Sequence, residues 1–261
     1  MKKNIIYLSI IAVAAIFVYT SCKRDVSYIA TYDTGNSSTA YIRVVQASPS
    51  FRALYSQPDS FNVYVNTTKI NGGILSYGSI FPAAGELYAA VPAGKQPIRL
   101  SLKGVVNTDS LTVATFTKTL VAGKYYSFIM TDSIMSASKD STQIFVTDTY
   151  AQPLQGYYSL RFVHAVVNDT AGLKVDVFSA RRNGNIFTGI KSDSVTTFLG
   201  LPYNPSVNDT LYVRRSGTAN NLTKAYVFGP VNQRVYTIVY MGDTKATTGT
   251  KVKALGLYTN Q

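Results

Sequence analysis

The sequence predicts an all-β protein with two tandem immunoglobulin-like antiparallel β-sandwich domains, placed after an N-terminal signal and tether. Short apolar or alternating runs recur about every 8–12 residues, and turn residues separate them. Tyr is abundant, with 20 residues, and Glu86 is the only Glu, although Glu is a favoured residue on helix surfaces. No segment keeps a 3.6-residue apolar period between strong caps, so strands are favoured throughout.

The first half of the chain supplies eight strand candidates, each rich in apolar, β-branched or aromatic residues. They are expected at residues 41–47, 61–65, 74–77, 87–91, 98–103, 113–120, 125–130 and 143–147. Two turns between them are near copies, Val-Pro-Ala-Gly-Lys at 91–95 and Leu-Val-Ala-Gly-Lys at 120–124. Gly94 and Gly123 can take the positive φ of a tight reversal. Neither turn has the flanking residues of a phosphate-binding loop.

The same pattern then begins again in the second half of the chain. The matched segments are residues 41–47 with 159–165, 62–64 with 176–178, and 126–129 with 236–239. They lie about 110 to 118 residues apart, as expected for two diverged copies with loop changes. Residues 151–156 lie between the copies and have linker composition. We therefore expect one domain over residues 40–150 and a second, diverged one over residues 157–261.

The N-terminus has the parts of an export signal: a basic start, an apolar run over residues 5–19, and small residues before Cys22. The run is shorter than the roughly 20 residues that cross a bilayer as a helix. The segment resembles the signal peptide of bacterial lipoproteins, in the loose form of the Bacteroidetes type, with Tyr19 where Leu is usual. An uncleaved membrane anchor is the alternative.

The resemblance implies that residues 1–21 are removed and that Cys22 is lipidated. Cys22 is the only Cys in the sequence, so it has no disulfide partner within the chain. Several acyl chains anchor a protein stably where one does not, and the expected partner at this end is the membrane. Residues 22–39 are polar and lack periodicity, which predicts a flexible tether. We expect an outer-membrane lipoprotein on the periplasmic face or at the cell surface; the lack of an acidic cluster after Cys22 favours the periplasmic face.

Residues 43–49, Arg-Val-Val-Gln-Ala-Ser-Pro, resemble the opening of DUF4397, an exported domain of unknown function. The family's later strand and its Tyr-Gly, Pro-Ala-Gly and Ala-Gly-Lys turns correspond in order to residues 62–65, 76–78, 91–94 and 122–125. The resemblance covers most of residues 40–132. The second half is a weaker copy, with Asn-Gln-Arg at 232–234 in place of Ala-Gly-Lys. The resemblance implies a β-sandwich in each half and brings no catalytic mechanism.

The chain is basic, with a formal charge of +12 that loss of Lys2 and Lys3 lowers to +10. Such a charge could suit nucleic acid, anionic polysaccharide or membrane phosphates. The tightest basic clusters, at 23–24, 181–182 and 214–215, are not interleaved with aromatics as in nucleic-acid modules. We therefore expect solvated surface charge and no nucleic-acid partner.

The sequence lacks the side chains that most catalytic mechanisms need. A Ser or Cys nucleophile needs a base, and the only His, His164, corresponds to Gln46 in the first half, which favours a structural position at a strand end or edge. One His and no free Cys make zinc improbable, and Asp169, Asp176 and Asp193 are too dispersed for calcium. We therefore predict a non-enzymatic protein with no catalytic residue, metal site or cofactor.

Five Asp-Ser or Asp-Thr pairs resemble the acceptor triplet for O-glycosylation of exported Bacteroidetes proteins. The acceptors would be Ser110, Ser133, Thr170, Ser194 and Thr210. The alternative is ordinary turn chemistry, in which Asp caps the backbone.

Binding is the functional route that the sequence leaves open. Tyr offers contact area and a hydroxyl at low entropic cost. Five Tyr residues are candidates for a binding surface, although Tyr also serves strand packing. They are Tyr55, Tyr77, Tyr88, Tyr203 and Tyr212.

We expect a non-enzymatic, lipid-anchored cell-envelope protein that serves binding, adhesion or structure, with an envelope glycan or protein as partner. One alternative is a fimbrial-type subunit, which would need an extended edge or a removable N-terminal strand; residues 23–39 are too polar to favour it. The other is a carboxylate-based hydrolase, which would show a deep cleft with two facing carboxylates.

Overall fold

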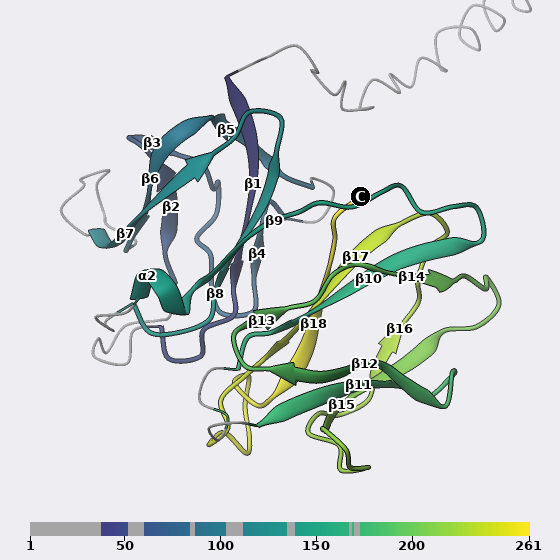
Figure 1. Cartoon of the computed structure of the whole chain (residues 1–261). Coiled ribbons are helices and arrows are strands. Elements are labelled where there is room, and N and C mark those ends of the chain that lie inside the picture. Colours follow the sequence, from purple (N-terminus) through teal and green to yellow (C-terminus); the bar gives the residue numbers. More distant parts are fainter. Residues whose placement is uncertain are drawn as a thin grey trace, which may run out of the picture. The chain divides into compact units, whose positions relative to one another are not determined.

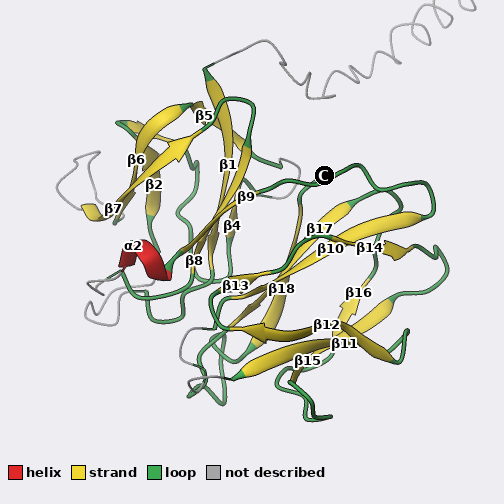
Figure 2. Ribbon diagram, in the orientation of Figure 1, coloured by secondary structure: helices red, strands yellow, loops and turns green. Residues whose placement is uncertain are grey.

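Strands make up almost all of the regular structure in the computed structural model of this chain, which confirms the all-β prediction (Figures 1 and 2). The structure describes residues 38–51, 60–83, 87–102, 112–134, 139–166, 169 and 173–261. Within these ranges the single helix is one turn, α2 (Lys139–Thr142). The described residues belong to one compact unit, residues 37–261.

The first half of this unit is a sandwich of two sheets. One sheet has the order β4-β1-β8-β9, with β5 also paired to β1, and the other has the order β3-β2-β6-β7. Their strands are β1 (Thr39–Gln46), β2 (Asn62–Val65), β3 (Thr68–Lys69), β4 (Ile80–Phe81), β5 (Ala89–Pro92), β6 (Gly94–Ser101), β7 (Thr112–Leu120), β8 (Tyr125–Met130) and β9 (Ile144–Thr147).

The second half has the same arrangement. One sheet has the order β13-β10-β17-β18, with β14 also paired to β10, and the other has the order β12-β11-β15-β16. Their strands are β10 (Tyr157–His164), β11 (Lys174–Ser179), β12 (Gly184–Lys191), β13 (Ser194–Val195), β14 (Leu199–Pro202), β15 (Asp209–Arg215), β16 (Tyr226–Phe228), β17 (Val235–Met241) and β18 (Ala254–Thr259).

Each half contains one parallel strand pair, whereas the sequence predicted antiparallel sheets. β1 runs parallel to β8, with Tyr41 opposite Tyr125, and β10 runs parallel to β17, with Ser159 opposite Val235. The other pairs between named strands are antiparallel. In each half the first strand lies inside its sheet, and a strand from late in the same half lies parallel beside it.

One face of β1 and one face of β10 pack into the core of their own sandwich, and the opposite faces pack into a third core between the sandwiches. Because both faces are buried, these strands are almost continuously apolar. Ile42 and Val44 pack into the core of the first sandwich, and Leu160 and Phe162 into that of the second. Each of these four side chains is at most 1% exposed. The two faces of one strand therefore serve two packing interfaces.

A third apolar core joins the two sandwiches. Val45 of β1 and Ile129 of β8 pack in one cluster with Val163 of β10 and Val239 of β17. These four are also at most 1% exposed. The outer face of the β1 sheet therefore packs against the outer face of the β10 sheet, and burial of this apolar surface favours the joined state.

The strand predictions for the first half hold with small shifts, except at residues 74–77. There Leu75 makes only an isolated bridge to Phe61, because Gly72, Gly73 and Gly78 surround this segment and favour turns. β1 already begins at Thr39, inside the predicted tether. The two-residue strands β3 and β4 were not predicted, since so short a segment carries no periodicity.

Candidate functional site

The linker between the two sandwiches follows a fixed path along the second sandwich. Tyr150 donates its hydroxyl hydrogen to the carbonyl of Asn260 at 2.9 Å. Gln152 Nε2 donates to the carbonyl of Gln233 at 3.1 Å, and Gln233 Nε2 donates to the carbonyl of Pro153 at 3.4 Å. The amide of Gly156 donates to Asn232 Oδ1 at 2.9 Å. A linker held at four points presents its side chains in defined positions.

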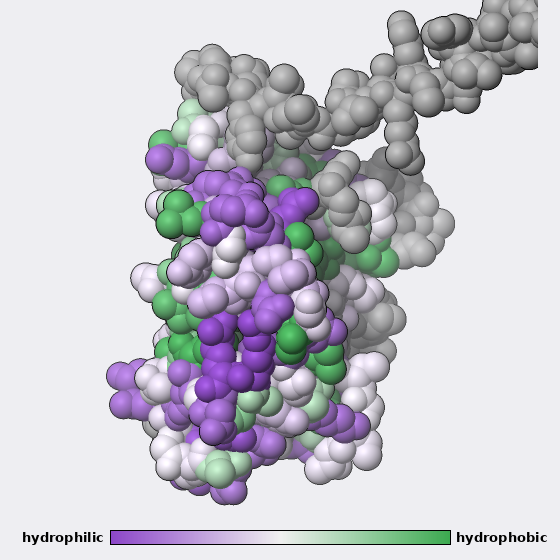
Figure 3. Space-filling model, turned by 90° about the vertical axis from the view of Figure 1, so that its right-hand side faces the viewer, coloured by the Kyte–Doolittle hydropathy of each residue, from purple (hydrophilic) through white to green (hydrophobic). Residues whose placement is uncertain are grey.

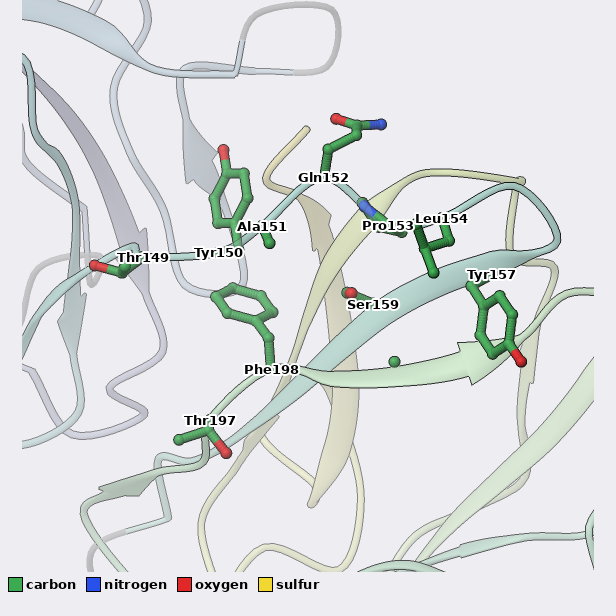
Figure 4. A pocket seen from close by; sticks show the side chains of 11 residues that line it. Thr149, Tyr150, Ala151, Gln152, Pro153, Leu154, Tyr157, Ser159, Thr197 and Phe198 are labelled. Carbon is green, nitrogen blue, oxygen red and sulfur yellow. The ribbon is translucent and has the colours of Figure 1, made fainter.

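A hollow of about 400 Å³ lies between this linker and the start of β10, and we call it the linker hollow (Figure 4). In Figure 4, Tyr150 and Phe198 lie against each other on one side, Leu154 and Tyr157 lie on the other, and Ser159 lies between them. The residues that line it are Thr149, Tyr150, Ala151, Gln152, Pro153, Leu154, Tyr157, Ser159, Thr197, Phe198 and Gly200.

The aromatic side of the linker hollow is held rigid from behind. The rings of Tyr150 and Phe198 meet edge to face, with centroids 5.4 Å apart and planes at 75°. The guanidinium of Arg161 lies 4.6 Å from the Phe198 ring centroid, a favourable cation–π distance. Phe198 is therefore fixed by two neighbours before any ligand arrives.

The opposite side of the linker hollow exposes apolar surface to solvent. Leu154 is 76% exposed and Tyr157 is 43% exposed. Apolar residues that gather at the rim of a hollow mark interaction surfaces more often than single scattered ones do.

Figure 3 shows one face of the molecule, on which hydrophilic residues run down the middle and hydrophobic ones lie mostly toward the margins.

Small residues on the floor of the linker hollow keep it open. Ser159 of β10 pairs with Gly200 of β14. The corresponding pair in the first half is Tyr41 with Ala90, and the Tyr41 ring stacks on Tyr125 with centroids 4.7 Å apart. A Cβ added at Gly200 would meet no atom within 4 Å. The second half has lost side-chain volume where the first half has an aromatic ring.

The linker hollow is lined by no ionisable Asp, Glu, Lys, Arg or His side chain. Its polar lining residues are Thr149, Gln152, Ser159, Thr197 and the two Tyr residues, of which Tyr150 already donates its hydroxyl hydrogen to Asn260. A hydroxyl both donates and accepts hydrogen bonds. This chemistry suits an uncharged ligand, because a charged one would lose water without gaining a partner.

A buried polar network lies behind the Phe198 ring, in the interface between the sandwiches. Arg161 pairs with Asp148 at 2.5 Å, and both side chains are at most 2% exposed. Arg161 also donates to Thr237 at 2.8 Å, and Asp148 accepts from Ser127 at 2.6 Å and from Tyr88 at 2.7 Å. Burial lowers the pKa of Arg161, but interactions with Tyr258 and with Asp148 outweigh it and leave the pKa above its ordinary value.

Arg43 occupies the corresponding position of the first half, where no carboxylate among the described residues is in hydrogen-bond contact with it. It lies 4.8 Å from the Tyr88 ring centroid and 4.7 Å from that of Tyr258. Its guanidinium donates to the carbonyl of Thr259 at 2.5 Å and to that of Leu87. Burial lowers the pKa of Arg43. This network is closed to solvent, so it supports the linker hollow rather than serving as a site.

His164 lies at the end of β10 and is fully buried. Its Nε2 is 3.2 Å from Asp169 Oδ2, and its Nδ1 is 3.3 Å from the carbonyl of Ile190. The neighbouring Tyr240 hydroxyl is buried and has no hydrogen-bond partner among the described residues; burial, then Asp169, raises its pKa. The linker hollow does not reach this group.

The structure places the remaining predicted site residues as follows. Cys22, Ser110 and Thr170 lie outside the described residues. Ser133, Ser194 and Thr210 are half-buried, and glycosylation there stays a prediction. Within the described ranges, no group of three or more His, Cys, Asp or Glu side chains could hold a metal ion.

None of the five Tyr residues that the sequence suggested for a binding surface lines the linker hollow. Tyr55 lies outside the described residues, and Tyr88 belongs to the buried network. Burial raises the pKa of Tyr77 to about 12. The linker hollow instead uses Tyr150 and Tyr157, which no sequence motif singled out. The available signal was the presence of two Tyr residues beside a predicted linker, where strand packing does not require them.

A family model described as "Domain of unknown function (DUF4397)" matches residues 40–175, more than half of the chain. The chain belongs to the DUF4397 family. The match covers the whole first sandwich and continues through β10 to the start of β11. The residues expected to carry the resemblance, 43–49 and the turns that follow, lie inside it.

The other comparisons add little to the DUF4397 assignment. A solved structure described as "Alpha-glucan binding by a streptococcal virulence factor" matches at 10% identity, over 85% of this chain and 97% of that one, with a TM-score of 0.23. At that score the likeness supports neither a fold nor a ligand. No curated protein matches the chain. In the part of the chain that the structure describes, no helix is long and apolar enough to cross a membrane.

Proposed function

We propose that this DUF4397 protein is a non-enzymatic, lipid-anchored protein of the cell envelope that binds an uncharged partner in the linker hollow. The observation that carries the proposal is the hollow's lining, which combines exposed apolar side chains with hydroxyls and has no charged residue. Concave, mostly apolar surfaces with a few convergent polar groups are the usual form of binding sites.

The rigidity of the linker hollow supports binding. The linker bonds to residues 232–233 and to Asn260, and Arg161 holds Phe198 from behind. A surface that is ordered before binding loses less conformational entropy when the ligand arrives. A carboxylate-based hydrolase would need two facing carboxylates, and the hollow is lined by none.

Truncation of the apolar rim tests the binding site. We expect the variant Leu154→Ser/Tyr157→Ser to lose affinity for envelope polysaccharide or envelope protein fractions that bind the intact chain. The control is Val121→Ser, because Val121 is 54% exposed on the first sandwich and does not line the hollow. Equal binding by both variants, measured by biolayer interferometry on folded protein, would contradict the proposed site.

The proposed anchor is a lipid on Cys22, as the N-terminal sequence predicts. Cells that express the full chain should incorporate an alkynyl fatty acid into it and retain it in the membrane fraction. Cys22→Ser should abolish both. Label on the Ser variant would contradict lipidation of Cys22. Protease treatment of intact cells then separates the cell surface, where the protein is degraded, from the periplasmic face, where it survives.

We further propose that the second half is a diverged copy of the DUF4397 domain. Its strand order matches that of the first half. Its turn at 231–234 also makes the same bonds as the Ala-Gly-Lys turn: the amide of Gly123 donates to the carbonyl of Thr39, and the amide of Gln233 to that of Tyr157. The second half therefore has the same backbone hydrogen bonds at this turn, although its residues there differ.

A further inference from the structure

We propose that the ligand of the linker hollow is a neutral carbohydrate, a short segment of an uncharged pyranose chain. This inference rests on the proposed binding function and specifies its ligand class. A pyranose ring has an apolar face of C–H groups and a rim of hydroxyls. The linker hollow offers matching groups for both, and its volume of about 400 Å³ lies within the range of small-ligand sites.

The aromatic residues supply the surface for the C–H face. The π-electron faces of aromatic rings are electronegative, so they attract the slightly positive C–H groups of a sugar. Tyr150 and Phe198 stand on one side of the hollow and Tyr157 on the other (Figure 4). Phe198 already has the Arg161 guanidinium at 4.6 Å.

The polar residues supply partners for the sugar hydroxyls. Thr149, Ser159 and Thr197 are lining residues, and each carries a hydroxyl that can donate or accept. A sugar hydroxyl has the same dual capacity, so each contact can form in either direction. An anionic sugar finds no cation among the lining residues, although the chain as a whole carries a formal charge of +12.

The floor of the hollow favours a carbohydrate over an extended peptide. A peptide that adds to a sheet is recognised by main-chain hydrogen bonds along a free strand edge. Here the floor residues Ser159 and Gly200 pair with each other across β10 and β14. The main chain of β10 at Ser159 is therefore paired on both sides, with Gly200 and with Val235, and side chains are the groups that a ligand meets there.

The test fills the hollow with the residues that the first half carries at the same places. Ser159→Tyr/Gly200→Ala reproduces the pair Tyr41 and Ala90, and Gly200 has open space for a Cβ. The control is Thr115→Tyr, an exposed position on β7 of the first sandwich. Thermal unfolding of each variant confirms folding. The probes are α-1,4- and β-1,4-linked neutral hexose oligomers, a uronic-acid oligomer and a random peptide library, measured by calorimetry and NMR.

We expect a neutral oligomer to bind the intact protein and Thr115→Tyr equally, and to bind the filled variant at least tenfold more weakly. Binding of peptide alone, lost on filling, would overturn the carbohydrate assignment and leave the proposed binding function standing. Preference for the uronic-acid oligomer, also lost on filling, would overturn both the neutral carbohydrate and the proposal that the partner is uncharged, and would leave only the location of the binding site. Binding that is unchanged by filling, or no binding by any probe, would overturn both proposals.

Discussion

The turns at 121–124 and 231–234 have the same backbone conformation although their side chains differ. Gly123 has φ 72° and Gln233 has φ 60°, so both occupy the left-handed region. For residues other than Gly this region costs roughly 1–2 kcal/mol. A second hydrogen bond is also equivalent in the two turns. The amide of Val121 donates to the hydroxyl of Tyr126, and the amide of Val231 donates to the hydroxyl of Tyr236.

Gln233→Gly should stabilise the protein by about 1 kcal/mol, because it removes the left-handed strain at this turn. The midpoint of urea unfolding, measured with an unchanged slope, reports the gain. Gly123→Gln is the converse control and should destabilise. A loss of stability in Gln233→Gly would show that the side-chain bond from Gln233 to Pro153, at 3.4 Å, outweighs the strain.

The strands β1 and β10 show what sequence patterns can and cannot reveal. Their apolar runs predict buried strands, and the structure confirms them. Each run also carries one Arg, Arg43 or Arg161, and both are 2% exposed. Periodicity assigns an Arg to solvent, whereas these two lie between sheets because the outer face of each strand is covered by the other sandwich. Only the docked arrangement of the halves reveals this role.

Asp148→Asn should destabilise the protein by about 3–5 kcal/mol, since it leaves the buried Arg161 without its ion-pair partner. Adding Arg161→Met should recover part of the loss, because an apolar residue of similar length fits the interface. Asp140→Asn, at an exposed position on α2, is the neutral control. Urea unfolding measures all three. If Asp148→Asn cost no more than Asp140→Asn, the ion pair would have no role in stability.

At the scale of the whole molecule, the two sandwiches behave as one packed body within residues 37–261. Their shared core includes Val45, Val163 and Val239. The sequence predicted two domains with a linker at 151–156, and these residues lie between β9 and β10. It could not predict the linker hollow, because the hollow depends on how the linker and β10 lie together in three dimensions.

The shared core should make the two sandwiches unfold in a single transition, although two independent domains would show two. Calorimetry of the intact chain should give one peak, with calorimetric and van't Hoff enthalpies in agreement. Val163→Lys places a charge in the shared core and should split the peak in two. Val121→Lys, on exposed surface, should leave it single. Two peaks from the unaltered chain would contradict a cooperative interface.

If Cys22 carries the proposed lipid, the entry of the chain into β1 limits how far from a membrane the linker hollow can reach. Thr39 accepts from the amide of Gly123, and the amide of Asp148 donates to the carbonyl of Tyr125, so the chain enters and leaves the first sandwich at the same end. The hollow begins one residue later, at Thr149. Residues 23–38, fully stretched, reach at most about 55 Å. With lipid on Cys22, only molecules within that distance of the bilayer, plus their own length, could be captured.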